Sequence, residues 1–217
     1  MERTKRATLV GIILLAIWFE ISAVGLHIEQ SRSLFQNLLF VNLVLSVGAL
    51  ALFHREWTVN FGIFAFAVFW IGYLVEFVGV KTGVIFGNFR FGEALGPKIG
   101  GVPPLIGFNW LILTYISGII VQKWSSNLWV RATLGAILMV VIDLIMEPMA
   151  MSFDLWVWQN GIIPVQNFFA WFVIAWGMNY GFHVLHQEKS NPLAMPLFLI
   201  YVTYYLTFFV VQSGFPS

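Results

Sequence analysis

Seven apolar runs set the pattern of the chain, each separated from the next by a polar segment. A helix needs roughly 20 mostly apolar residues to cross a bilayer, and every run is close to that length. We therefore expect an all-α fold: a polytopic membrane protein with a bundle of about seven transmembrane helices and two ordered long loops, in a single integral-membrane domain of residues 1–217. The expected spans cover approximately residues 7–28, 34–53, 58–80, 102–121, 128–147, 165–185 and 192–212.

The polar segments between the runs differ in length, and this difference orders the bundle. Four of them are short, namely EQSRS, HREWT, QKWSSN and HQEKSN, whereas residues 81–101 and 148–164 form longer loops. If the seven helices alternate in direction, both long loops lie at one end of the bundle and the amino terminus lies at the other. Seven of the eleven Lys and Arg side chains, including those of the amino-terminal tail, fall on the amino-terminal side, which predicts a cytoplasmic amino terminus.

Composition agrees with a membrane protein and argues against several functions. The 217 residues are 59% hydrophobic and 10% charged, with a mean hydropathy of +0.85, whereas soluble domains carry about 25% charged residues. A net charge of +1 offers no basic patch, so nucleic acid is not an expected partner. Cysteine is absent, which rules out disulfides and thiolate metal sites. His183 and His186 lie at the opposite end of the bundle from the membrane acids, and we expect no metal site.

Two acids stand one helical turn apart where the fifth run ends, in IDLIMEPMAMSFDLWVWQNG. A charge inside a span costs roughly 2.5–3.5 kcal/mol, so such residues usually face the bundle interior and function there. Asp143 and Glu147 should project from one helix face, about 6 Å apart. In a low-dielectric setting, one carboxyl group of such a pair can stay protonated and act as a general acid while its neighbour acts as a general base. Pro148 is expected to end the helix.

Glu76, in WIGYLVEFVG, is a third candidate because its run ends on the same side of the membrane as Asp143 and Glu147. The alternative is a structural role, in which these acids meet interfacial water or pair with Arg90 or Lys98 of the first long loop. Under either hypothesis the acids gather at the end of the bundle that carries the long loops.

The first long loop, KTGVIFGNFRFGEALGPKIGGVPP, is rich in glycine but matches no nucleotide-binding motif. Glu93 and Ala94 stand where a Walker sequence needs Lys and Ser or Thr, and no G-x-G-x-x-G occurs. Neither a phosphate site nor a dinucleotide site is therefore indicated. The alternation in IFGNFRFG predicts a short hairpin that turns at Gly87-Asn88. Near a membrane such backbone is tolerated only where protein or a wet cavity covers it.

Aromatic residues make up 18% of the chain, and many of them crowd near the acids. They can form a belt at the membrane interface. They can instead line a slot for a flat, rigid, apolar molecule, where their faces would also attract a carbocation. Composition leaves both possibilities open for the residues concerned, which are Trp156, Trp158, Phe168, Phe169, Trp171 and Trp176.

Three ordered motifs carry a resemblance to a known family. They are TGVIFGNFRFGEALGPKIGGVPPLIGFNW, DLIMEPMAMSFDLWVW and IPVQNFFAWF, and the likeness runs from about Tyr73 to Trp176. Together they resemble the membrane carotenoid-biosynthesis family that includes the CruF-type carotenoid 1,2-hydratases. The resemblance implies addition of water to the terminal 1,2 double bond of an acyclic carotenoid end group, with no cofactor. In this chemistry an acid protonates the alkene, the tertiary cation captures water, and a base removes a proton.

By their positions in the matched motifs, particular residues take on expected roles. Asp143, Glu147 and Glu76 are the catalytic acid/base candidates, with Asp143 favoured as the proton donor and Glu147 as its partner. The implied partners are a carotenoid polyene, water and membrane lipid, and other carotenoid enzymes are further candidates. Residues expected to place water, orient the carboxyl groups or bind substrate are Asp154, Asn88, Arg90, Asn109, Asn167, Tyr73, Trp156, Trp158 and Trp171.

Other functions remain open at the level of the sequence. A carotenoid end-group cyclase or isomerase would use the same protonation, but an internal alkene of the substrate would then capture the cation. A proton-coupled transporter would also need intramembrane acids, although here they cluster at one face and no inverted repeat is evident. A retinal protein needs a buried lysine, and the last run, PLAMPLFLIYVTYYLTFFVVQ, has none.

Overall fold

The computed structural model of the protein describes residues 2–185 and 190–214, so the prediction for His186 lies outside the described residues. The described chain is mainly helical, which confirms the all-α membrane fold. A short antiparallel ribbon joins β1 (Phe89–Phe91) to β2 (Trp156–Trp158), and one turn of 3₁₀ helix follows at Gln159–Gly161. The α-helices are α1 (Glu2–His27), α2 (Glu29–Asn37), α3 (Leu39–Phe53), α4 (Val59–Thr82), α5 (Leu105–Val121), α6 (Leu128–Ser152), α7 (Val165–Leu185) and α8 (Ala194–Gly214).

Each of the predicted runs contains a helical segment, but the segments differ in how they would cross a membrane. Within the described residues, five helices are long and apolar enough to span, namely α1, α4, α6, α7 and α8. The second run is broken into α2 and α3, which meet at 49° and together form a sixth candidate span. The fourth run yields α5, a shorter apolar helix of 17 residues, because Pro103 and Pro104 delay its start.

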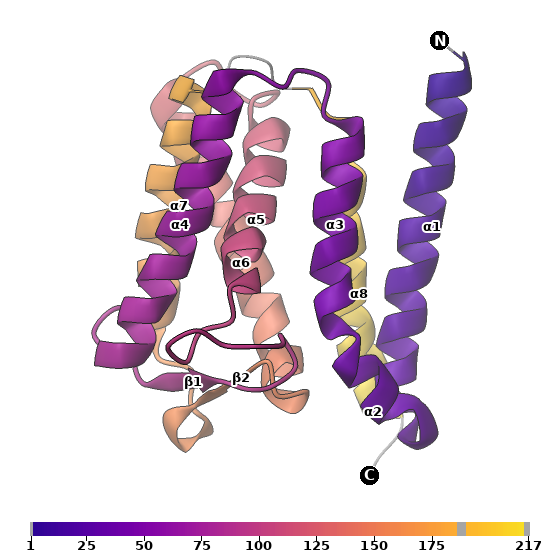
Figure 1. The fold of residues 1–217 in the computed structure, drawn as a ribbon, viewed down its shortest axis with the longest axis vertical. Coiled ribbons are helices and arrows are strands. Elements are labelled where there is room, and N and C mark those ends of the chain that lie inside the picture. Colours follow the sequence, from indigo (N-terminus) through magenta and orange to yellow (C-terminus); the bar gives the residue numbers. More distant parts are fainter. Residues whose placement is uncertain (1, 186–189, 215–217) are drawn as a thin grey trace.

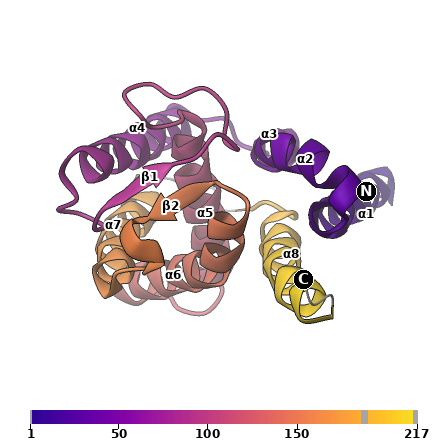
Figure 2. The ribbon, with the colours of Figure 1, turned by 90° about the horizontal axis from the view of Figure 1, so that it is seen from below.

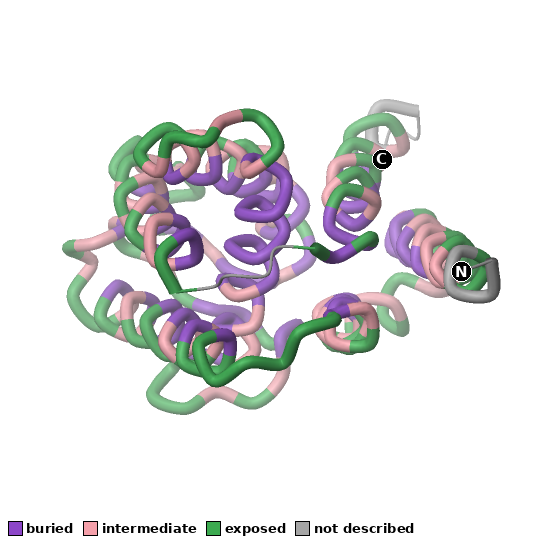
Figure 3. The backbone as a smooth tube through the Cα atoms, turned by 90° about the horizontal axis from the view of Figure 1, so that it is seen from above, coloured by how far each residue is buried: buried purple, intermediate pink, exposed green. Residues whose placement is uncertain are grey.

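The helices form two neighbouring groups. Helices α4 to α7 make a bundle, and α1, α3 and α8 stand beside it, with α8 packed on α5 and α6 (Figures 1 and 2). Seen along the bundle, the buried positions of α4 to α7 face one another and the exposed positions face outward (Figure 3). Many of the outward side chains are large and apolar, as at Leu14, Phe66 and Val210. Such a surface suits contact with lipid tails.

The long loops lie together, opposite the amino terminus (Figure 1). The descending helices α4 and α6 both end there, and the two strands lie across that end of the bundle (Figure 2). This arrangement confirms the predicted grouping of the loops. The side of the membrane on which the amino terminus lies stays a prediction.

Two local expectations were wrong. Strand β1 does not fold back on its own loop after Gly87, but pairs with β2 from the other long loop, with Phe89 opposite Trp158 and Phe91 opposite Trp156. The Phe89 and Trp158 rings lie 5.0 Å apart, a cross-strand aromatic pair that a local hairpin would not supply. Helix α6 also continues through Pro148 to Ser152. Proline removes only its own N–H, and the next turn re-forms, with Phe153 N donating to Met149 O.

The topology can be tested by labelling because the chain contains no cysteine. Cysteines introduced at Val84 and Gln159, both exposed in the long loops, should react with a membrane-impermeant maleimide from the same side. A cysteine at Ser126, in the exposed α5–α6 connection, should react only from the other side. Labelling of all three variants from one side would contradict the arrangement.

Candidate active site

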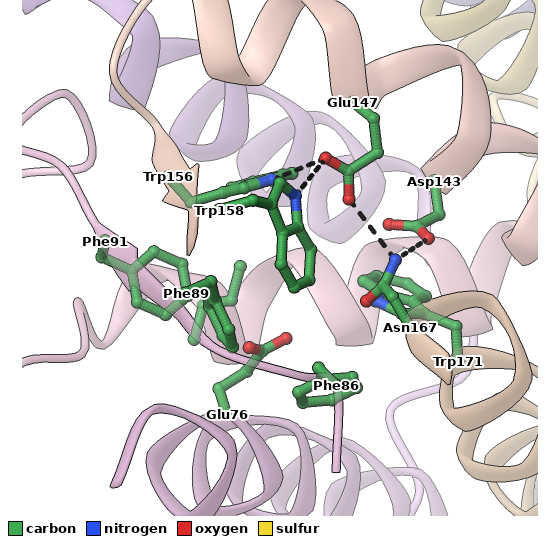
Figure 4. A pocket seen from close by; sticks show the side chains of 11 residues that line it. Glu76, Phe86, Phe89, Phe91, Asp143, Glu147, Trp156, Trp158, Asn167 and Trp171 are labelled. Atoms are coloured by element: carbon green, nitrogen blue, oxygen red, sulfur yellow. Dashed lines mark hydrogen bonds between the residues drawn. The ribbon is translucent and has the colours of Figure 1, made fainter. Parts of the chain in front are cut away.

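A buried pocket lies between the β1–β2 ribbon and the helices of the bundle. Its empty volume is about 280 Å³. Helix α4 contributes Glu76, helix α6 contributes Asp143 and Glu147, and the ribbon closes the pocket with four aromatic rings (Figure 4). The structure therefore gathers three acids that are up to 71 residues apart in the chain. The lining residues are Glu76, Phe86, Phe89, Phe91, Ile106, Asp143, Glu147, Trp156, Trp158, Asn167 and Trp171.

Glu147 is held by two indole groups of β2. Trp156 Nε1 and Trp158 Nε1 both donate to Glu147 Oε2, at 2.9 and 2.8 Å (Figure 4). An indole N–H can only donate, so this oxygen acts as an acceptor in both bonds. The Glu147 residue is 1% exposed, and the two bonds satisfy a carboxyl oxygen that burial would otherwise leave without partners. Glu147 is thus fixed as an acceptor at the boundary between helix and ribbon.

Asp143 has a different environment one turn earlier on α6. Asn167 Nδ2 of α7 donates to Asp143 Oδ2 at 3.0 Å and lies 3.4 Å from Glu147 Oε1, so one amide bridges both carboxyl groups (Figure 4). Asp143 Oδ1 is buried and has no hydrogen-bond partner among the described residues. This oxygen is therefore available to carry a proton and deliver it into the pocket, whereas Glu147 is engaged as an acceptor.

Glu76 faces this pair from α4. Its Oε1 accepts a hydrogen bond of 3.0 Å from Trp110 Nε1 of α5, and the Trp110 ring stacks on Trp171 with centroids 3.9 Å apart. The three carboxyl groups are close enough to interact electrostatically. Trp110 approaches α4 closely because Gly72 has no side chain: a Cβ there would lie 2.6 Å from Trp110 Cβ. Gly72 and Trp110 together set the position of Glu76.

The aromatic residues divide between the two roles left open by the sequence. Trp156, Trp158 and Trp171 line the pocket. Phe169 is 69% exposed on the outside of α7, and Trp176 donates to Thr133 on α6 away from the pocket. Several further residues that line or support the pocket are not predicted from the sequence, although the IFGNFRFG and GFNW segments contain most of them. They are Phe86, Phe89, Phe91, Ile106 and Trp110.

Other predicted site residues lie outside the pocket. Tyr73 OH donates to Ile99 O of the first long loop, at 2.9 Å. Asn88 and Arg90 line an open hollow on the outer face of the ribbon, since Arg90 alternates with the inward-facing Phe89 and Phe91. The structure therefore brings none of these three polar groups to the carboxyl groups.

Asp154 and Asn109 are likewise separate from the carboxyl groups. Asp154 Oδ2 accepts from Glu93 N at 3.0 Å and so ties the two long loops together. Asn109 is buried in a neighbouring cavity. The suggested pairing of an acid with Lys98 is not formed either, because Lys98 Nζ binds Glu93 Oε1 at 2.7 Å.

A larger cavity of about 630 Å³ lies among α3, α4 and α5, toward the opposite end of the bundle. Its lining is apolar apart from His54 and Tyr115, whose Nδ1 and hydroxyl group bind each other at 2.7 Å. Burial lowers the pKa of His54, which favours the neutral ring. Within the described residues, no three His, Asp or Glu side chains lie close enough together to hold a metal ion. Of these two cavities, the carboxyl pocket is the one lined by the three acids, Glu76, Asp143 and Glu147.

Comparison with known proteins agrees with the motifs that line this pocket. The sequence profile of the family described as "Carotenoid biosynthesis protein" matches residues 35–215. The chain belongs to this family. The bisanhydrobacterioruberin hydratase of Haloarcula japonica is 29% identical over 109 residues, a match that covers 46% of this chain and 36% of that protein. The chain thus matches little more than a third of the length of this curated relative. No solved structure matches the chain.

The close approach at Gly72 gives a test of how Glu76 is positioned. Gly72→Ala should lower the stability of the purified protein by about 1–3 kcal/mol, because the added methyl group must displace Trp110. Gly62→Ala, on the same helix with no atom within 4 Å of its added Cβ, is the control and should be neutral or slightly stabilising. Thermal unfolding in detergent measures both. Equal stability of the two variants would show that Trp110 is not held against Gly72.

Proposed function

We propose that the protein is a carotenoid 1,2-hydratase, which adds water to the terminal double bond of an acyclic carotenoid end group. The observation that carries this proposal is a buried pocket in which carboxyl groups with unlike hydrogen bonding face a wall of aromatic rings. Membership of the carotenoid biosynthesis family and the likeness to a carotenoid hydratase support the same reaction.

The first step is protonation of the alkene. Asp143 gives a proton from its free Oδ1 to the less substituted carbon, C2, which leaves a tertiary cation at C1. The electron-rich faces of the pocket rings, such as Phe89 and Trp158, stabilise this charge in a setting of low dielectric. The neighbouring carboxylate adds electrostatic stabilisation.

The second step is capture of the cation by water. The water oxygen forms a bond to C1, and Glu147 accepts the proton that the water releases. Asn167 holds both carboxyl groups during these transfers. One proton enters at C2 and one leaves the water, so the reaction balances with water alone. Proton exchange between the carboxyl groups and water restores the starting state, and Glu76 is the third group that can take part.

The position of the pocket suits the two reactants. A polyene is apolar and lies in the bilayer, while water reaches the end of the bundle from the interface. The carboxyl and aromatic side chains that line the carboxyl pocket would contact the reacting end group, and the rest of the polyene would extend outside the pocket.

A carotenoid end-group cyclase is the second candidate, because the same acid and the same aromatic wall would serve it. The two reactions differ only in what captures the cation, which is water in a hydratase and an internal alkene of the substrate in a cyclase. The carboxyl groups and the Asn167 amide that line the pocket can bind water by hydrogen bonds, which favours capture of the cation by water.

The carboxyl groups should be chemically essential. Asp143→Asn and Glu147→Gln preserve size but remove acidity, and each should lower product formation by about 100-fold or more. Glu20→Gln is the control, because Glu20 is another acid within a span but lies on α1, where it accepts from Thr207. Its activity should stay near the parental value. Product yield per amount of purified protein, with an acyclic carotenoid as substrate, measures all three; near-parental turnover in the Asp143 and Glu147 variants would remove the proposed acid and base.

Isotopic labelling separates the candidate functions. In water enriched in heavy oxygen, a hydratase product should gain one labelled oxygen, and in heavy water one non-exchangeable deuterium at C2. A cyclase would take up deuterium but no oxygen, and a transporter would cause neither change. Mass spectrometry of the product distinguishes these results. An oxygen derived from dioxygen would contradict the mechanism.

A further inference from the structure

A second cavity adjoins the carboxyl pocket on the side of α3 and α8. Its empty volume is about 400 Å³, and Ile106 and Trp156 line both spaces. These two side chains therefore form the wall between them. Trp156 is also the residue whose indole N–H binds Glu147, so this one side chain contacts both the second cavity and the carboxyl group.

The cavity carries polar groups although helices surround it. Asn42, Asn109, Tyr204 and Tyr205 line it, and all four are buried. Tyr204 OH accepts from Asn42 Nδ2 at 3.2 Å, and Tyr205 OH lies 3.2 Å from the sulfur of Met146. A thioether is only a weak acceptor, so the Tyr205 hydroxyl retains most of its capacity for a stronger bond.

Asn109 stands out among these groups. Its side chain is 4% exposed, and Nδ2 has no hydrogen-bond partner among the described residues. A buried amide without a hydrogen-bond partner destabilises the folded protein, and ordered water commonly satisfies such groups. Asn109 lies one turn beyond Ile106 on α5, so it stands next to the wall shared with the carboxyl pocket.

We propose that this second cavity is a water chamber, in which Asn109 and Tyr205 hold the water that captures the cation. The proposal rests on the hydratase function. A buried water usually makes about three hydrogen bonds, and the amide of Asn109 and the hydroxyl groups of Tyr204 and Tyr205 offer that number. Asn109 and Tyr205 are positioning residues, because they orient water and do not touch the alkene.

The chamber gives the water a defined route. Its oxygen approaches the cation past Trp156 and Ile106, and it releases a proton to Glu147 on the other side of the same indole. If water is not delivered, the cation loses a proton and re-forms an alkene. In heavy water that return leaves deuterium in the recovered substrate, because the proton added at C2 came from solvent.

The competition between water capture and proton loss provides the test. Purified Asn109→Leu and Tyr205→Phe proteins are incubated with an acyclic carotenoid in heavy water, and both hydrated product and deuterium in the recovered substrate are measured. Hydration should fall by about tenfold, the effect of losing one hydrogen bond to the water. Deuterium exchange into substrate should persist or increase. Loss of the fold would abolish both, so retained exchange excludes that explanation.

Tyr201→Phe is the control, because Tyr201 lies one turn away on α8, binds Ser46 and does not line the chamber. It should hydrate at the parental rate. Parental hydration in both chamber variants would overturn the chamber and leave the hydratase function intact. Parallel loss of hydration and exchange in both would also overturn it, because the residues would then serve protonation or folding. If the parental protein gave neither product nor exchange, the hydratase function itself would fail.

Discussion

The two hydrogen bonds from indole groups to one carboxyl oxygen of Glu147 are the constraint on which the rest of the site depends. Glu147 is buried within an apolar bundle, where an unpaired carboxyl group would be costly. Trp156 and Trp158 meet that need from the same face of β2, and β2 itself pairs with β1. One buried acid therefore joins α6 to the ribbon, and the ribbon joins the two long loops over the end of the bundle.

The same constraint makes the carboxyl groups of α6 unlike each other. Glu147 Oε2 is occupied by two donors, while Asp143 Oδ1 has no partner among the described residues. Asn167 then fixes the spacing between them. Two acids of similar chemistry can take different roles when their surroundings differ, one as proton donor and the other as acceptor. Here the difference arises because two indole N–H groups donate to Glu147 Oε2, whereas no described group donates to Asp143 Oδ1.

The proposed division of the site follows the polarity of the two reactants, an apolar polyene end and water. The pocket wall is aromatic where a polyene end and its cation would lie, and amide and hydroxyl groups gather in the adjoining cavity. Trp156 borders both spaces and binds the acceptor carboxylate. On this view the outcome of the reaction depends on access across one side chain, because the same cation can be trapped by water or lose a proton.

The sequence alone is enough to predict the helical membrane fold, the end of the bundle at which acids and long loops meet, and the family. Span length, alternation of direction and ordered motifs can all be read from local stretches of the chain. The sequence also placed Asp143 and Glu147 on one helix face. It did not determine that β1 would pair with β2, that Trp110 would support Glu76, or that Tyr73, Arg90 and Asp154 would lie away from the pocket. Those features were decided by tertiary structure, because each depends on a partner that arrives from a distant part of the chain and on which groups remain to satisfy a buried polar atom.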